Sequence, residues 1–402
     1  MTLLPRSNNW TGWLAAGAAL AIAVALHASR LDMPRDQVNL IFSTEEAETY
    51  RSRVREGSRE DFPLSVRFGP QESVSATAHL RGQSSFGCGR KSLTLNLRGK
   101  RPRFASFESV TDKFYLLSLC RDRGFVRQHT VLSLWRRLGL FPLRHRFVDL
   151  RFNESSHGVY LLVERMDRLR IKKEGFRALL RRRFDYEEGT TFVEVKENLT
   201  SDTRARVDYA TIRERVRGLS GQALIEGFRT TLNLDQYLLW MASNALLENG
   251  DSVDELWIVS EARAPSGGDD RYLSFFAWDP EDIFTPCHLE GRFAFDDTHE
   301  LTYCAEAEWD RMLLSDPIAY ELYVDTLEEL VERRLTPEVF DQALVETEIA
   351  LRDLLERESV AGPMAHVLGP NESAREIEML RESFTSSRTR IRENIARYRA
   401  RR

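Results

Sequence analysis

The chain has 402 residues, of which 57 are basic and 62 acidic, and its formal net charge is −5. With 42% hydrophobic and 30% charged residues, it has the composition of a folded globular protein, which excludes a disordered chain and a collagen-like or Pro/Gly-rich chain. The near-neutral balance argues against a nucleic-acid binder, which carries a basic excess on its binding domain. The length allows two or three domains or one large bilobal domain.

The N-terminus contains an apolar segment. No charged residue occurs from Trp13 to Ala28, and an arginine lies on either side of this stretch. A basic start, an apolar centre and small residues at the end are typical of a secretory signal peptide. The alternative is an uncleaved membrane anchor over residues 10–28 with Trp10 at the interface. Residues 1–30 therefore predict export to a periplasmic, extracellular or membrane-anchored location, and they leave open whether the segment is cut.

Four cysteines are present, Cys88, Cys120, Cys287 and Cys304. An even number in an exported chain permits disulfides, and Cys287 with Cys304 is the favoured pair because the two are close in sequence. The alternative is four buried free thiols, since free cysteine behaves as a small hydrophobic residue. No CxxC or CxxH spacing occurs, so a zinc site has little support.

The first half of the chain, over residues 38–196, has mostly the pattern of strands. Leucines alternate with polar residues over 93–97, which is the period of a half-buried strand. Residues 146–163 are expected to form a β-hairpin that turns at the sequence SSHG. Between these segments, the apolar residues from 131 to 138 follow the spacing of a buried helix face.

The second half is mainly helical. Residues 234–245 predict a helix with Asn233 as its N-cap, and we expect this helix to end at Asn249-Gly250 with the glycine in a left-handed conformation. The apolar runs ELWIVS and RYLSFFAW predict two strands, and helices are expected from Glu306 onward. The layout is that of an α+β fold with a strand-rich first lobe, a helical second lobe and a ligand cleft between them.

Residues 168–183 carry eight basic residues and one acidic residue. A solvated basic helix face is the simplest interpretation. The functional alternative is a surface patch for an acidic protein or for anionic lipid head groups.

Two clusters in the first half have the chemistry of phosphate binding. The segment RGQSSFGCGRKS is a Gly- and Ser-rich turn that contains Arg81, Arg90 and Lys91, and it can offer backbone N–H groups and cations to phosphate oxygens. A flexible hairpin with surface cations is the alternative. Glu164 ends the second strand of the expected hairpin and can orient a lysine toward a nucleotide phosphate. A surface carboxylate is the alternative for Glu164.

A third cluster combines carboxylates from two segments. Asp251 follows Asn-Gly, and Asp279 ends the aromatic run FFAWDPED. Phosphoryl transfer needs one carboxylate to position the acceptor hydroxyl and another to hold Mg²⁺, whereas ordinary turn chemistry is the alternative. The further oxygen donors nearby are Asp254, Glu255, Glu281 and Asp282, a set suited to Mg²⁺ or Mn²⁺.

The order of these clusters resembles the CotH kinase family, a group of atypical kinase-like proteins named after a spore-coat protein. The motifs run RGxSSxxxxRKS, GFVRQHTVLSLWRRLGL, NESSHGVYLLVERMD, ENGDSVDELWIVS and FFAWDPED. The likeness extends from about Val38 to the C-terminus. It implies a bilobal kinase-like fold with a strand-rich lobe over residues 37–200 and a helical lobe over residues 201–402 that carries the catalytic and metal motifs.

The resemblance also implies roles for individual residues. Asp251 would be the catalytic residue, and Glu164 the partner of Lys91. The residues implied to bind ATP are Arg81, Lys91, Arg127 and Glu164, and those implied to bind the metal are Asp279, Glu281 and Glu255. The chain departs from the family at Asp254-Glu255, where the family carries asparagine and aromatics, and at Glu281, which replaces an aspartate. With both changes the site stays negatively charged.

The resemblance leads to one functional expectation and two alternatives. We expect an exported kinase that transfers the γ-phosphoryl group of ATP to Ser or Thr of a protein, with Mg²⁺ or Mn²⁺. One alternative is a non-catalytic envelope or surface-assembly protein that keeps the fold without turnover. The other is an enzyme that transfers AMP instead of phosphate.

Overall fold

The computed structural model describes residues 36–402, apart from residues 83, 100–102, 105–106, 109–110, 186, 188–189, 200, 262–271, 289–299 and 370. The predicted N-terminal signal or anchor segment lies outside the described residues. Within the described part, no helix combines the length and the apolar character that a membrane span requires.

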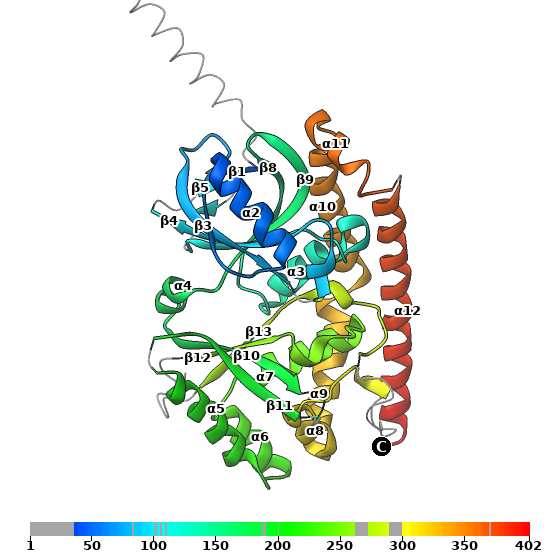
Figure 1. Cartoon of the computed structure of the whole chain (residues 1–402). Helices are drawn as coiled ribbons and strands as arrows, with labels where there is room; N and C mark the ends of the chain where they lie inside the picture. The colour runs from blue at the N-terminus through cyan, green and yellow to red at the C-terminus, as the bar shows by residue number, and fades with distance from the viewer. Residues whose placement is uncertain are drawn as a thin grey trace, which may run out of the picture.

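A closed barrel of seven strands forms the first part of the protein (Figure 1). Its strands, in order around the barrel, are β1 (Gln37–Ile41), β2 (Phe62–Phe68), β3 (Val74–Arg81), β4 (Ser92–Arg98), β7 (Lys113–Leu117), β9 (Ser155–Glu164) and β8 (His145–Phe152). The closing pair, β1 with β8, is parallel, and the other pairs are antiparallel. Helix α2 (Thr44–Glu56) joins β1 to β2, and the two-residue strands β5 (Arg103–Phe104) and β6 (Phe107–Glu108) pair between β4 and β7.

The alternating leucines of β4 confirm the predicted strand, because Leu93, Leu95 and Leu97 all lie in the apolar core of the barrel. The predicted hairpin is also confirmed as β8 and β9. Its turn is not at SSHG, however. Asn153 and Glu154 separate the two strands and have φ values of 47° and 69°, as in the two-residue turns that match the twist of a hairpin. The sequence SSHG belongs to β9.

A second sheet lies beside the barrel and has the order β11-β10-β12-β13. Its strands are β10 (Phe176–Asp185), β11 (Thr190–Asn198), β12 (Leu256–Glu261) and β13 (Leu273–Ala277), all antiparallel. The expected strands ELWIVS and RYLSFFAW are therefore confirmed. The expected boundary at residue 200 stays a prediction; β10 precedes this residue and pairs with β12, which follows it.

The basic run 168–183 is not a solvated helix face. It forms the short helix α4 (Arg168–Lys173) and then most of β10. Alternate residues of a strand point to opposite faces of the sheet. Arg181 and Arg183 therefore lie on one face of β10, and Arg182 lies on the other. The interpretation as a helix was wrong because the run contains an apolar segment, residues 178–180, that the sheet buries.

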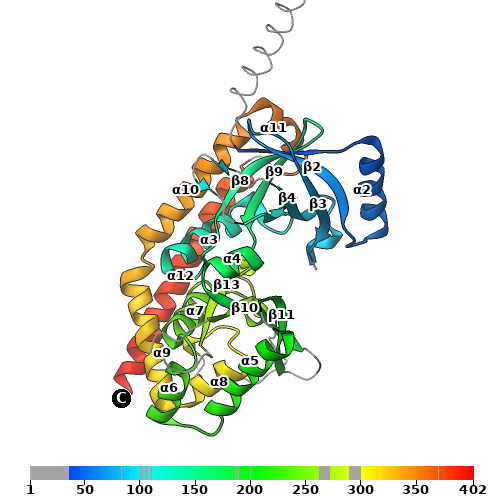
Figure 2. The ribbon, with the colours of Figure 1, turned by 90° about the vertical axis from the view of Figure 1, so that its left-hand side faces the viewer.

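Helices pack against both sheets. The helices besides α2 and α4 are α3 (Arg127–Leu138), α5 (Asp202–Val216), α6 (Gly221–Arg229), α7 (Leu234–Leu246), α8 (Glu308–Ser315), α9 (Pro317–Glu329), α10 (Pro337–Leu355), α11 (Glu358–Met364) and α12 (Glu372–Ala400). Both α10 and α12 run along the barrel and the second part alike (Figures 1 and 2). Consistent with this, α10 contacts α3 and β8, and α12 contacts α7 and α9. The expected α+β class is confirmed.

Two predicted helices are confirmed as α3 and α7, and the Asn233 side chain caps α7 by accepting a hydrogen bond from the Gln236 backbone. The end of α7 differs from the expectation. The helix stops at Leu246, and Glu248 rather than Gly250 has the positive φ, at 44°. Gly250 is needed for a different reason, which concerns the candidate site.

Two half-buried histidines lie where α3 meets β8. The rings of His129 and His145 lie 5.0 Å apart, and His129 stacks on Phe147. Burial, reinforced by Arg136, lowers the pKa of His145 to about 4. Burial also lowers the pKa of His129 well below its ordinary value. Because the unfolded chain takes up protons at these histidines first, stability is lost as the pH falls from about 6.5 toward 4.

This linkage predicts the behaviour of a His145→Gln variant. At pH 7 this variant should have a lower free energy of unfolding than the parent. Urea denaturation should show that difference shrink by about 3 kcal/mol between pH 7 and pH 4, because protonation of His145 destabilises only the parent. His366→Gln, which changes an exposed histidine, is the control for loss of an imidazole. A His145→Gln deficit that does not change with pH would contradict the assignment.

Candidate functional site

The register of two strands brings acidic residues together. In the pairing of β12 with β13, Leu256 lies opposite Ala277, and the Trp278 backbone donates a hydrogen bond to the Glu255 carbonyl, 3.1 Å away. Asp254 and Glu255 precede β12, and Asp279 follows β13. The carboxylates of two segments separated by more than twenty residues therefore meet at one end of the strand pair.

Asp251, Asp254 and Glu255 form a cluster that can bind a metal ion, because one carboxylate oxygen from each lies within 4.8 Å of the others. One oxygen of Glu255, Oε2, is buried and has no hydrogen-bond partner among the described residues. A buried oxygen of this kind is costly unless something binds to it. The expected convergence of Asp251 with the segment around Asp279 is thus seen in the structure.

Asp251 lies on a tight turn that is held by the segment 282–288. The Gly250 N–H donates to the Asp282 carbonyl at 2.9 Å, and the Gly250 carbonyl accepts from the His288 N–H at 2.9 Å. A β-carbon at Gly250 would lie 2.3 Å from the Pro286 carbonyl oxygen and 2.6 Å from the Thr285 hydroxyl. Glycine is therefore required here by close backbone packing, and its φ is not positive.

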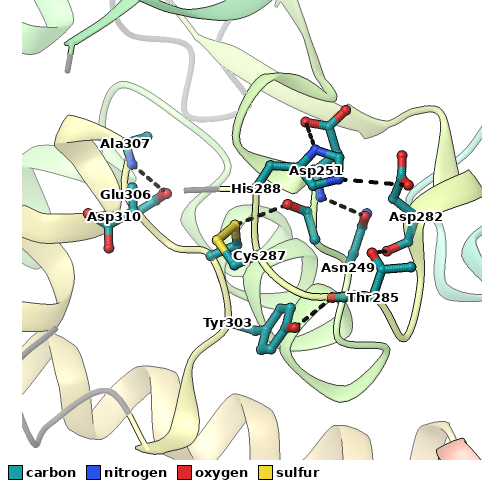
Figure 3. Close-up of a disulfide and its surroundings, with 12 residues drawn as sticks. Asn249, Asp251, Asp282, Thr285, Cys287, His288, Tyr303, Glu306, Ala307 and Asp310 are labelled. Carbon is teal, nitrogen blue, oxygen red and sulfur yellow. Dashed lines mark hydrogen bonds and ion pairs between the residues drawn. A yellow bond between two sulfur atoms is a disulfide. The ribbon is translucent and has the colours of Figure 1, made fainter. Parts of the chain in front are cut away.

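A disulfide fixes the same region. Cys287 is bonded to Cys304, and the Cys304 sulfur also contacts the Gly250 carbonyl at 3.2 Å (Figure 3). The predicted Cys287–Cys304 pair is thus confirmed, and Cys88 pairs with Cys120. The Cys88–Cys120 disulfide ties the Gly- and Ser-rich turn to the segment that leads to α3.

Arginines of β10 face the acidic cluster. Arg181 contacts the Glu255 carboxylate, and its Nε donates to the Asp254 carbonyl at 3.2 Å. Arg183 Nη1 lies 3.2 Å from Asp254 Oδ2. Sequence reasoning missed both residues because it interpreted the basic run as a helix. Read instead as a strand, the run places residues 181 and 183 on one face by its period of two.

Arg182 points to the opposite face of β10 and supports the cluster from behind. Its side chain is buried, its Nε donates to the Val253 carbonyl at 2.6 Å, and its Nη1 donates to the Tyr237 hydroxyl at 2.9 Å. Asp310 lies 3.5 Å from the same Nη1 and balances the charge. The turn from Asp251 to Glu255 is therefore held by cations on both sides.

Arg81, at the end of β3, is the cation that the barrel contributes. Its guanidinium lies 4.0 Å from the centre of the Tyr115 ring and 5.8 Å from that of Trp278. It is also close enough to Asp279 to oppose the rise in the pKa of that carboxyl. The expectation that Arg81 belongs to the site is compatible with this position, which faces the acidic cluster across the boundary between barrel and second sheet.

The expected pair of Lys91 and Glu164 was wrong. Lys91 Nζ donates to the Phe86 carbonyl at 2.8 Å, whereas Glu164 accepts from the Arg144 backbone at 3.1 Å and lies 3.5 Å from Arg170. Strand register explains the separation. Glu164 lies opposite Phe114, and Phe114 lies opposite Leu95 on the next strand. Lys91 precedes Leu95 by four residues, which is about 13 Å along an extended chain. The ATP-binding roles of these two residues remain predictions.

Two further predicted site residues have contacts within the protein. Arg127, at the start of α3, pairs with Glu376 and donates to the Ile283 carbonyl at 2.8 Å, which ties α3 to α12 and to the segment after Asp282. Glu281 accepts from Gln128 Nε2 at 3.0 Å. These contacts give Arg127 a structural function, and its binding of a cofactor stays a prediction, as does the binding of a metal by Glu281.

Burial is the main reason that the acidic groups titrate abnormally. It raises the pKa of Asp251 to about 6, with Asp254 adding to the effect and His288 opposing it. It raises the pKa of Glu281 to about 8, together with Asp279 and Asp282. The pKa of Glu255 is raised well above its ordinary value by burial, against the opposing charge of Arg181. Such a concentration of like charge favours binding of a cation.

An apolar pocket adjoins the acidic cluster. Its wall combines residues of the barrel side with residues of the second sheet, among them Tyr115, Leu143, Met166, Leu179, Trp257 and Trp278. Trp257 and Trp278 lie two residues from Glu255 and next to Asp279, respectively, and their rings meet edge to face at 5.7 Å. The arrangement places flat apolar side chains directly beside carboxylates and arginines.

The close packing around Gly250 yields a prediction. Gly250→Ala should lower the free energy of unfolding by about 2 kcal/mol, because the new methyl group meets backbone atoms that cannot move aside cheaply. Urea denaturation measures the change. The control is Gly362→Ala, where a β-carbon meets nothing within 4 Å. Equal stability of the two variants would contradict the tight turn.

The family model described as CotH kinase protein matches residues 78–392, well over half of the chain. The match begins within β3. The elements β1, α2 and β2 therefore lie outside it, and two of them, β1 and β2, are strands of the barrel. No curated protein matches the chain. The matched region contains the acidic cluster, the arginines of β10, both disulfides and the aromatic pocket. The chain belongs to the CotH kinase protein family.

Proposed function

We propose that this protein is an ATP-dependent kinase that transfers the γ-phosphoryl group to Ser or Thr of a protein, with Mg²⁺ or Mn²⁺. One observation carries the proposal. Four carboxylates, Asp251, Asp254, Glu255 and Asp279, gather beside Arg81 and an aromatic pocket at the boundary between barrel and second sheet. In this proposal the barrel and the second sheet with its helices act as the two lobes of a kinase-like fold.

The metal-binding residues in this proposal are Asp254, Glu255 and Asp279. Their donors are all carboxylate oxygens, which suit Mg²⁺ or Mn²⁺. Oε2 of Glu255 is buried and has no hydrogen-bond partner among the described residues, so it is free to bind a cation. A divalent ion held there would neutralise charge on the phosphates. Arg181 and Arg183 fix the carboxylates in place.

The nucleotide would lie along the boundary between barrel and second sheet. The aromatic pocket beside Trp278 offers flat apolar surfaces for the base. Arg81 lies over the Tyr115 ring of this pocket and near enough to Asp279 to affect its pKa, and its guanidinium can bind phosphate oxygens. The cavity has a volume of about 10 Å³, which is room for no more than a water molecule, so this proposal requires the pocket to open before a purine ring can enter. Lys91 is too far from Glu164 to be oriented by it, and Arg81 therefore takes the leading position among the cations.

Asp251 would position the acceptor. It is partly exposed, with 25% of its side chain accessible, and it lies at the rim of the cluster. Its carboxylate can accept a hydrogen bond from a Ser or Thr hydroxyl and take the proton as the oxygen bonds to the γ-phosphorus and the bond to the β–γ bridging oxygen breaks. Positioning and charge neutralisation, rather than a covalent enzyme intermediate, would provide the catalysis.

Export is a further part of the proposal. Two disulfides among the described residues support it, since disulfides persist in oxidising compartments. The apolar N-terminal segment would act as a signal peptide or as an anchor over residues 10–28.

Transfer of label tests the proposed activity. The full-length protein is incubated with γ-labelled ATP, MnCl₂ or MgCl₂, and dephosphorylated casein as acceptor. Asp251→Asn and Asp279→Asn should each lower the initial rate by about 100-fold or more, as expected for loss of an acid–base or metal group. Asp235→Asn is the control, because this exposed aspartate lies at the other end of α7. Label transfer that survives both site variants contradicts the proposal, and mass spectrometry of the product distinguishes phosphate from AMP.

The non-catalytic scaffold remains a second candidate because Arg181 already pairs with Glu255 and so neutralises part of the cluster without a metal. A thermal-shift titration separates the two candidates. ATP with MnCl₂ at 100 times its Kd should stabilise a nucleotide-binding protein by about 2.7 kcal/mol. The scaffold predicts no shift with ATP and either metal ion.

A further inference from the structure

His288 lies between two carboxylates of the candidate site. Its Nδ1 is 3.2 Å from Asp251 Oδ1, and its Nε2 is 3.8 Å from Asp282 Oδ1 (Figure 3). The nearer contact is within hydrogen-bonding distance and the farther one is not. An ionised carboxylate only accepts hydrogen bonds, so the shorter contact requires a proton on Nδ1.

Three contacts hold the backbone at His288 next to the turn that carries Asp251. The backbone N–H of His288 donates a hydrogen bond to the Gly250 carbonyl at 2.9 Å, and the same carbonyl contacts the Cys304 sulfur. Cys287, the residue before His288, is bonded to Cys304. A covalent bond and a backbone hydrogen bond thus hold the histidine against the turn that carries Asp251.

We infer that His288 is a positioning residue that orients the carboxylate of Asp251 for the acceptor hydroxyl. The inference rests on the proposed function. With Nδ1–H bonded to Oδ1, the carboxylate is prevented from rotating freely, and Oδ2 is left for the acceptor. The Cys287–Cys304 disulfide serves this role by keeping His288 next to Asp251.

Stability alone does not explain the arrangement. His288 has 43% of its side chain exposed, and exposed pairs of this kind contribute little to folding. Replacement of His288 should therefore leave the protein folded and change the site selectively. Two conservative variants make the test sharper. In His288→Asn the amide N–H lies near the position of Nδ1, and in His288→Gln it lies near the position of Nε2.

Kinetics with casein as acceptor give the first test. His288→Ala should lower kcat about tenfold with an unchanged KM for ATP, as expected for loss of one orienting hydrogen bond. His288→Asn should restore most of the rate and His288→Gln should not. His366→Ala, at an exposed histidine outside the site, is the control. A kcat of His288→Ala equal to the parent's, or equal rates for the Asn and Gln variants, overturns the inference.

The disulfide gives a second test. Replacing both Cys287 and Cys304 by serine should lower kcat to the level of His288→Ala, and combining these changes with His288→Ala should cause no further loss, since all act through one interaction. Losses that multiply in the combined variant overturn the inferred link between the disulfide and His288.

A readout without turnover separates this inference from the proposed function. In ¹⁵N-histidine-labelled full-length protein, assigned by its absence from His288→Ala, the Nδ1 signal should be that of a protonated nitrogen and should shift in Asp251→Asn. If the parent transfers no label, the proposed function fails while this measurement still stands. An unprotonated Nδ1 that is insensitive to Asp251→Asn overturns the contact itself.

Discussion

The antiparallel register of β12 on β13 is the constraint on which the candidate site depends. It leaves Asp254 and Glu255 beside Asp279, although residues 262–272 separate the two strands in the sequence. Carboxylates this close repel each other and lose hydration on burial, so the cluster costs free energy by itself. The surrounding strands and turns must supply the compensation.

Cations from two directions provide that compensation. The consecutive arginines of β10 alternate between the faces of the sheet, so that Arg181 and Arg183 bind the carboxylates while Arg182 holds the Val253 carbonyl from behind. Arg81 adds a charge from the barrel. Since the barrel and the second sheet both contribute, the helices that run along both of them, α10 and α12, help to hold the site together.

Periodicity in the sequence predicted much of the local structure. The alternating leucines of β4, the apolar face of α3 and the capped start of α7 were all recognisable, because local spacing determines which side chains can face a core. The likeness to the CotH kinase family then indicated Asp251 and Asp279. Neither source could show which ion pairs form, because partners across strands depend on register and on which way the sheet faces.

The individual errors follow from the same limit. Glu164 was expected beside Lys91, but the barrel places them in different rows and gives Glu164 to Arg170. The arginines of β10 were taken for a surface helix, since composition alone does not distinguish a charged helix from a strand end.

The strongest test of the account is the position of the metal in a crystal grown with MnCl₂ and a non-hydrolysable ATP analogue. The account predicts an anomalous Mn²⁺ peak bound by Asp279 together with Asp254 or Glu255, and a peak elsewhere, or none, would contradict it.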